Sequence, residues 1–389
     1  MKFISKPIQI LTILLCPFWF AAAHADEIKV GAHLSLSGAT ARAGSGFLEG
    51  MKVAEEMFNA ASKKHKIKLV VIDDESVPAK AVSAVEKLAA EGVVGIVGGY
   101  GSNVIGPASD MAEKFGLTYL TAGGVSDELT KRGHKHFFRL NNNPGYERGV
   151  MTLFEELKVK SVSIVYSTKE APAKLAIGVE KAAQAKGIKV AMHPFDPAIT
   201  DFKPVINKIR VIDKPEVILM SGYENDYVGI IRAAKVLKPQ VKAMIGMWSL
   251  ATTKMSSEFP DLMTNVIGST MFAQPMVFTK PQDKRFAETY QRMYAKEVDY
   301  QAQFGFTKAE LLFEAVTRAA DKGALKKGGL SEELRKTDRD TFIGRVTFDE
   351  YGDNPNFRLR MGQHQGGKVV VVSPRADSTG AIVYPGVPW

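Results

Sequence analysis

The sequence predicts an α/β protein of two similar lobes, each a parallel sheet flanked by helices. Two observations predict this class. Short β-type runs alternate with amphipathic helical segments along nearly the whole chain, which is the pattern of right-handed βαβ units. The alternation restarts after the segment Asn141-Asn142-Asn143-Pro144, which favours two lobes over one large sheet.

The first half of the chain supplies the elements of the first lobe. Strands are expected at 28–34, 68–72, 93–97 and 117–121. A helix after the first strand is indicated by apolar residues at three-to-four spacing, which share one buried face: Phe47, Met51, Ala54 and Phe58. Ser76 is the expected N-cap of the next helix, with Pro78 in its first turn. A further helix covers 104–115.

The second half repeats the rhythm and then changes character. Its expected strands are 162–166, 188–192, 217–220 and 241–247, and the helices that separate them lie near 173–186, 203–212 and 226–237. Long helical patterns follow at 283–294 and 304–322. The chain ends in an expected β-hairpin, with strands at 357–365 and 368–372 around the turn Gly366-Gly367.

The first 25 residues have the pattern of a secretory signal. Lys2 and Lys6 precede an apolar stretch at 8–20, and the small residues of 21–25 end it, which predicts cleavage after Ala25. The apolar stretch is shorter than the roughly 20 residues that a membrane-spanning helix needs. An uncleaved anchor is therefore the less favoured alternative.

Composition narrows the class of protein. With 389 residues, 45% of them apolar and 24% charged, the chain is long enough for about two domains and too apolar to be disordered. Its net charge of +9 is not gathered in one run, so nucleic acid is not an expected partner. The only cysteine, Cys16, lies in the expected signal, so the remainder can form no disulfide.

No motif for catalysis or for a cofactor stands out. The segment from Gly99 to Val104 has two of the three glycines of a dinucleotide-binding loop, but it follows the third strand and lacks an acidic partner for a ribose. His134 and His136 have no carboxylate near them in sequence, which favours a solvated turn over a metal site. We therefore expect no cofactor and no metal, and nothing in the sequence indicates an enzyme.

Short segments spread along the chain together resemble one known family. They are Val30-Gly31, Leu34-Ser35-Leu36-Ser37-Gly38, Gly44, Gly50, Val97-Gly98-Gly99-Tyr100-Gly101-Ser102, Pro107-Ala108-Ser109-Asp110, Glu128-Leu129-Thr130, Phe138-Arg139, Asp201-Phe202 and Gly222-Tyr223. In order and spacing they are similar to the leucine/isoleucine/valine-binding family of periplasmic substrate-binding proteins. The resemblance covers essentially the whole chain after residue 25.

The resemblance implies a fold and a role. The fold would be the type I periplasmic binding protein, with two Rossmann-like lobes joined by a three-strand hinge. After a signal at 1–25, lobe 1 would combine 26–143 with 273–345, and lobe 2 would combine 144–272 with 346–389. Such a protein, monomeric and without enzymatic activity, captures a small solute in the periplasm and presents it to the permease of an ABC importer.

The first expected ligand contact lies at the start of a helix. Ser102 and Asn103 follow a strand and a glycine-containing segment that includes Tyr100. The first N–H groups of a helix carry partial positive charge and glycine allows close approach, so a ligand carboxylate is expected there. The family's equivalent serine makes this contact. The alternative is a plain N-cap.

The loop after the next strand is the second expected contact. By resemblance, Gly123, Gly124 and Val125 face the ligand. Val125 stands where the family's amino-acid binders carry a threonine, so one hydrogen bond to the ligand's polar end is lost. The alternative is that the two glycines only shape a turn.

The second lobe departs from the family's amino-acid binders. Tyr223 matches an aromatic wall residue, but Ala171 stands where a tyrosine is usual and Trp248 where an acidic residue holds the ligand's ammonium. Losing that carboxylate favours an aromatic or apolar acid, because a buried unpaired ammonium is costly. Two readings remain open: Glu224 or Asp226 replaces the acid, or Trp248 is simply a core residue.

Three further residues are weaker candidates. Arg42 lies beside Ala43, which occupies the position of a family pocket tyrosine, and would either pair with a ligand carboxylate or remain solvated. Phe304 and Phe306 begin a long helix near the expected hinge and are assigned either to the ligand wall or to the core.

The ligand expected from these positions is a small carboxylate with an aromatic or apolar body. The alternatives are a branched-chain or other aliphatic amino acid, and a sensor of amides or signalling ligands that uses the same fold.

Overall fold

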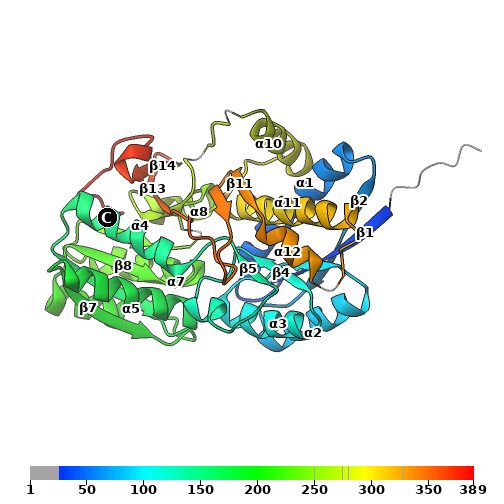
Figure 1. Ribbon diagram of the computed structural model, residues 1–389. Helices are drawn as coiled ribbons and strands as arrows, with labels where there is room; N and C mark the ends of the chain where they lie inside the picture. The colour runs from blue at the N-terminus through cyan, green and yellow to red at the C-terminus, as the bar shows by residue number, and fades with distance from the viewer. Residues whose placement is uncertain (1–25, 249, 274, 279, 327) are drawn as a thin grey trace, which may run out of the picture.

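The computed structural model describes residues 26–389 except 249, 274, 279 and 327. The expected signal at 1–25 lies outside the described residues. Figure 1 shows two lobes side by side, with the early strands in one and the C-terminus in the other. No helix in the described part of the chain is long and apolar enough to cross a membrane.

Lobe 1 is built on a parallel sheet. Within the described residues this sheet has five strands in the order β2-β1-β3-β4-β5, namely β1 Asp26–Leu34, β2 His65–Asp73, β3 Gly95–Val97, β4 Thr118–Thr121 and β5 Phe137–Arg139. Its helices are α1 Ala41–Ala61, α2 Pro78–Ala90, α3 Ser102–Lys114, α10 Pro281–Tyr294, α11 Tyr300–Asp321 and α12 Gly329–Arg335. A small antiparallel pair, β11 Asp338–Thr341 and β12 Gly344–Thr347, lies beside α10 and α11.

Lobe 2 is built on a mixed sheet. Over the described residues its seven strands run in the order β14-β13-β10-β9-β8-β6-β7, namely β6 Ser161–Ser167, β7 Lys189–Phe195, β8 Val217–Ser221, β9 Ala243–Gly246, β10 Ile267–Thr270, β13 Arg360–Gln365 and β14 Lys368–Ser373. In that described sheet the pairs β10–β13 and β13–β14 are antiparallel, and the other pairs are parallel. The helices are α4 Asn143–Leu157, α5 Glu170–Ala185, α6 Lys203–Lys208, α7 Glu224–Leu237, α8 Thr253–Glu258 and α9 Pro260–Met263.

Two glycines let α11 cross α1 at very short range. A Cβ at Gly50 would lie 2.0 Å from the carbonyl oxygen of Ala302, and one at Gly305 would lie 2.2 Å from that of Phe47. Both distances are far below any van der Waals contact, so only glycine fits. The late helix α11 is thereby packed into the core of the lobe that the early strands begin, as Figure 1 shows.

Two of the three segments that cross between the lobes are fastened together by buried polar groups. Arg139, at the end of β5, is 1% exposed and donates to both carboxylate oxygens of Asp353 at 3.0 and 2.7 Å. Asn142 Nδ2 donates to the same carboxylate, and Asn354 Nδ2 donates to the carbonyl of Leu140. Paired Arg–carboxylate bonds of this kind are strong and directional. The crossovers after β5 and after β12 therefore form one rigid unit.

The structure confirms the predicted fold class and corrects details. The division into two sheets holds, so the single-sheet alternative is wrong. Ser76 is not the N-cap of α2, because Val77 takes that position while Ser76 donates to the carbonyl of Ser37. The helix expected at 203–212 is α6 followed by a π-helical turn at Ile209–Asp213. The C-terminal hairpin is present as β13 and β14.

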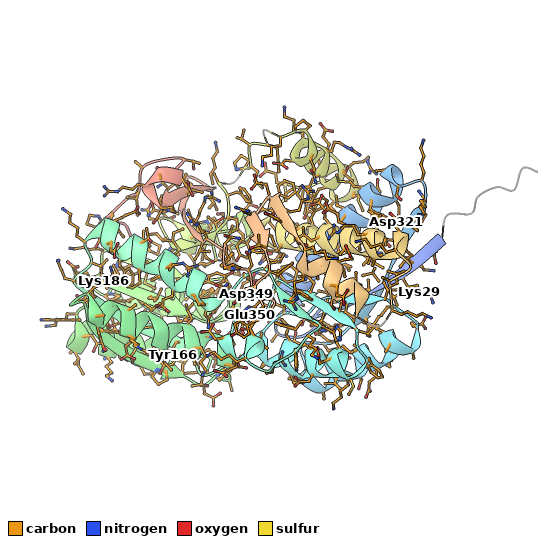
Figure 2. The ribbon with its side chains drawn as sticks, viewed as in Figure 1. Lys29, Tyr166, Lys186, Asp321, Asp349 and Glu350 are labelled. Atoms are coloured by element: carbon orange, nitrogen blue, oxygen red, sulfur yellow. The ribbon has the colours of Figure 1, made fainter. Side chains whose placement is uncertain are left out.

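Charged side chains are spread over both lobes. Figure 2 shows Lys186 at the outer end of lobe 2, with Lys29 and Asp321 at the opposite end of the molecule. Several of these charges are paired, as in Lys29 with Glu91 at 3.2 Å.

Candidate functional site

Two adjoining cavities lie between the lobes at the carboxyl ends of the parallel strands. The inner cavity has aromatic walls, to which Phe47, Tyr100, Tyr146, Tyr223, Trp248 and Tyr300 contribute. The outer cavity, of about 230 Å³, is lined by the loop at 38–43 and by the start of α7. Tyr100 and Tyr223 line both cavities and so separate them. This is the edge at which α/β sheets bind ligands.

The wall contributed by lobe 1 is a backbone surface at the start of α3. Gly101, with φ of 86°, is the N-cap of that helix, and its N–H donates to the carbonyl of Gly123. A Cβ at Gly123 would lie 2.3 Å from the carbonyl oxygen of Gly99, so a side chain is excluded there. The first intrahelical bonds run from the N–H groups of Val104 and Ile105 to the carbonyl of Gly101, so the N–H groups of Ser102 and Asn103 have no acceptor within the helix.

The predicted lobe 1 residues divide into two groups. Tyr100, Gly123 and Val125 line the inner cavity. The side chains of Ser102 and Asn103 line neither cavity, because the Ser102 hydroxyl is buried and accepts from the N–H of Ser126 at 3.1 Å while Asn103 is exposed.

Gly124 also lies outside the two cavities. A Cβ there would meet Leu129 at 2.7 Å and Ile105 at 2.9 Å, so this glycine faces the core behind the wall. Ser102, Asn103 and Gly124 therefore line neither cavity, whereas their neighbours Gly101 and Gly123 line the inner one.

The wall contributed by lobe 2 is a stack of rings. Trp248 is 5% exposed and stacks on Tyr223 at 6.2 Å between ring centroids, with 28° between their planes. Tyr146 packs edge-on against Trp248 at 5.6 Å, and Tyr100 reaches across from lobe 1 to Tyr223 at 6.2 Å. Ala171 lines the same cavity, and its small side chain adds no ring to this wall. Trp248 is thus a cavity residue as well as a buried one.

Polar side chains that sequence reasoning missed form the floor of the inner cavity. The hydroxyls of Tyr146 and Tyr300 are 2.5 Å apart, and Asn141 Nδ2 donates to Tyr146 at 3.0 Å. Burial raises the pKa of Tyr146 to about 12, although its polar neighbours act in the opposite direction. Burial also raises the pKa of Tyr223. These phenols are therefore neutral at physiological pH.

The two acids proposed to hold an ammonium, Glu224 and Asp226, are engaged elsewhere. Among the described residues, no charged side chain lines the inner cavity. Asp226 accepts from the N–H of Tyr223 at 2.8 Å, at the first turn of α7. Glu224 lines the outer cavity and pairs with Arg42, whose Nε lies 3.1 Å from its carboxylate. Burial raises the pKa of Glu224 to about 7, against the effect of Arg42 and of Lys254.

Arg42 links the two lobes. Besides Glu224, its guanidinium contacts Glu258 at 2.6 Å and lies over the ring of Phe259 at 5.9 Å. Arg42 belongs to α1 in lobe 1, and these partners all belong to lobe 2. A second interlobe contact joins the Ser126 hydroxyl to the carboxylate of Glu170 at 2.6 Å. The lobes are therefore closed on each other.

The remaining candidates lie in the core or on the surface. Phe304 and Phe306 are 0% and 1% exposed, and Phe304 supports Tyr300 from behind at 5.0 Å. His134 does have a carboxylate near it in space, that of Asp110 at 3.1 Å, whereas His136 faces a serine. The described residues contain no group of three His, Cys, Asp or Glu side chains that could hold a metal.

Comparisons with known proteins agree with this architecture. A family model described as periplasmic binding protein matches residues 27–368. The leucine-, isoleucine-, valine-, threonine- and alanine-binding protein of Pseudomonas aeruginosa is 25% identical over 343 residues, which are 86% of this chain and 88% of that protein. The chain belongs to the periplasmic binding protein family. Within it, the chain is a type I protein of the leucine/isoleucine/valine-binding branch, which consists of solute-binding proteins.

Solved structures share the fold and differ in what they hold. The branched-chain amino acid transporter substrate-binding protein LivJ of Streptococcus pneumoniae, in complex with isoleucine, has a TM-score of 0.78 at 23% identity, covering 88% of this chain and 98% of its own. A solute-binding protein of an ABC transporter from R. palustris, in complex with benzoate, has a TM-score of 0.80 at 18% identity, covering 92% and 98%. The fold therefore accommodates both kinds of ligand.

Proposed function

We propose that this protein is the periplasmic solute-binding component of an ABC importer and that its solute is a small carboxylate with an aromatic or apolar body. The observation that carries the ligand class is the inner cavity, which has ring faces from both lobes and no charged side chain among its described lining residues. Flat aromatic walls suit an apolar ring. The N–H groups at the start of α3, which have no acceptor within the helix, supply the site for the anion when the lobes close on a ligand.

Closure of the lobes is the proposed working step. The inner cavity measures about 20 Å³, which is room for about one water molecule. Across this cavity the rings of Tyr100 in lobe 1 and Tyr223 in lobe 2 already contact each other, with 6.2 Å between their centroids, so no ring fits between them. The cavity therefore widens to admit a ligand and closes over it. A ligand that touches both lobes only in the closed form shifts the population toward that form, which the permease then recognises.

A branched-chain amino acid is the second candidate, favoured by the names of the sequence relatives. Its ammonium would need a carboxylate, and Glu224 is a candidate because it follows Tyr223 in the chain and lines the outer cavity. That carboxylate would have to leave Arg42 first. The cost of this exchange is the physical reason to prefer an acid without an ammonium.

Calorimetric titration of the exported protein tests the ligand class. We expect benzoate-like acids to bind and leucine to bind at least tenfold more weakly. Trp248→Glu should weaken benzoate binding at least tenfold, because the substitution removes a ring from the wall and adds a carboxylate that repels the ligand anion. Val236→Glu adds the same charge at an exposed position of α7 and should change nothing. Tight leucine binding with no response to any aromatic acid would refute the proposed ligand.

The cellular parts of the proposal have their own tests. The mass of the exported protein reports whether cleavage follows Ala25. Sedimentation reports whether the protein is a monomer, and co-purification with a membrane permease separates transport from sensing. We propose that lobe 1 comprises 26–143 with 273–345 and lobe 2 comprises 144–272 with 346–389. Amide hydrogen exchange at the crossovers between these ranges should change when a ligand binds. Turnover of a bound ligand would contradict a purely binding role.

A further inference from the structure

The floor of the inner cavity carries polar atoms that the proposed carboxylate site does not use. Asn141 Oδ1 and Trp248 Nε1 are buried and have no hydrogen-bond partner among the described residues. The two residues are 3% and 5% exposed, and both line the cavity. Trp248 Nε1 lies close enough to the Tyr146 hydroxyl to influence its pKa, yet the geometry falls outside a hydrogen bond. Buried unpaired groups are uncommon and ask for an explanation.

The tyrosine pair adds one more unused donor. A single hydrogen bond joins the hydroxyls of Tyr146 and Tyr300, and it uses one of their two protons. Asn141 Nδ2 donates to the hydroxyl oxygen of Tyr146, so this bond uses a lone pair of that oxygen and not a hydroxyl proton. The second of the two hydroxyl protons is therefore still available. No acceptor for that proton is found among the described residues. The floor thus presents one acceptor, Asn141 Oδ1, and two donors.

This combination matches a hydroxyl group. A hydroxyl donates one hydrogen bond and accepts two, whereas a carboxylate only accepts and an ammonium only donates. Resting on the proposed function, we infer that the solute is a hydroxylated aromatic acid. Its carboxylate occupies the start of α3, and its ring hydroxyl donates to Asn141 Oδ1 while accepting from Trp248 Nε1 or a tyrosine hydroxyl.

The floor and the anion site come from separate elements, which sets the spacing of the two ligand groups. Asn141 and Tyr146 stand at the crossover into α4, Tyr300 begins α11, and Trp248 follows β9. The proposed anion site is the start of α3, which follows β3, and β3 lies two strands from β5 in the same sheet. The hydroxyl therefore points away from the carboxylate, toward the crossovers, at the meta or para position of a benzoate ring.

Calorimetry with a matched set of probes tests the inference on the unaltered protein. The probes are benzoate, 3-hydroxybenzoate, 4-hydroxybenzoate and 4-methoxybenzoate. We expect one hydroxybenzoate to bind at least tenfold tighter than benzoate, and the methoxy compound, which accepts but does not donate, to lose that gain. Equal binding of benzoate and both hydroxybenzoates, or equal binding of the methoxy and hydroxy compounds, would overturn the inference and leave the proposed function intact.

Two asparagine variants locate the contact. Asn141→Ala should reduce the gain from the hydroxyl, measured as the ratio of hydroxybenzoate to benzoate affinity in the same variant, to threefold or less. Asn143→Ala is the control, because Asn143 also has a buried unpaired Oδ1 but lines neither cavity. An unchanged gain in Asn141→Ala would sink the assignment. Binding of leucine with no response to any of the four acids would instead overturn the proposed function itself.

Discussion

Lys308 provides a sharp test of how this protein tolerates a buried charge. Its side chain, in α11, is 0% exposed, and its Nζ has no hydrogen-bond partner among the described residues. The Nζ lies over the ring of Phe47 at 3.9 Å, behind the wall of the inner cavity. Burial lowers the pKa of Lys308 from 10.5 to about 7. The ammonium is therefore much less stable in the folded than in the unfolded chain.

The magnitude follows from linkage. Between pH 7 and 10.5 the unfolded chain binds more protons at this residue than the folded chain, so stability rises with pH across that window. The difference between the two pKa values, at about 1.4 kcal/mol for each pKa unit, amounts to about 4 kcal/mol at pH 7. Replacing Lys308 by Met removes this penalty, and repacking costs up to about 1.5 kcal/mol.

Urea unfolding as a function of pH measures the effect. Lys308→Met should be more stable than the parent by about 3 kcal/mol at pH 7, and this difference should fall by about 4 kcal/mol by pH 10.5, which leaves the variant equal to or slightly less stable than the parent. Lys189→Met, at an exposed position of β7, should show no such pH-dependent difference. If Lys308→Met is no more stable at pH 7, or if its advantage is independent of pH, the ammonium is not desolvated and the reasoning fails.

Three further predictions follow from contacts described above and from one buried histidine. Arg42→Gln removes the ion pairs between the lobes and should weaken ligand binding about three- to tenfold in calorimetry. Lys52→Gln removes an ion pair within α1 and should leave the affinity unchanged. Equal affinities of the two variants would show that the interlobe ion pairs do not favour closure. Burial lowers the pKa of His364 to about 4, so between pH 6.5 and 4 the unfolded chain binds more protons at this residue than the folded chain. Stability should therefore fall by about 3 kcal/mol as the pH falls through that window. The same loss of stability with falling pH in His364→Gln, measured by urea unfolding, would contradict this. Gly305→Ala should lower the free energy of unfolding in urea by at least about 2 kcal/mol, because α11 cannot move off α1. In Gly106→Ala the new Cβ meets only Leu129, at 3.8 Å, so the stability should be equal or higher. Similar losses of stability in both variants would argue against the close crossing.

Local patterns predicted the elements whose apolar periodicity is long. The expected helix at 304–322 is α11, Tyr300–Asp321, and the expected strand at 28–34 is β1. The strands β5 and β10 were missed, because Phe137–Arg139 has only three residues and Ile267–Thr270 has two polar residues among four. Short strands in the middle of a fold take their conformation from their neighbours rather than from their own pattern.

Part of the candidate site was predictable from the order and spacing of the segments. Tyr223 and Trp248 were identified on the lobe 2 wall, and both line the inner cavity. The floor was not, because Tyr146 and Tyr300 meet only after two crossovers have brought distant segments together. The hydrogen bond between the Ser102 hydroxyl and the N–H of Ser126 also depends on tertiary structure, so the local sequence pattern could not predict it.

The close crossing of α1 and α11 has a consequence for how the chain reaches its native state. The strands and helices of 26–139 cannot complete their core until 300–321 has been made and has travelled back to them. Contacts of such long sequence separation slow folding. The early segment therefore stays incompletely folded until the late helix is available, which suits the export to the periplasm that we propose.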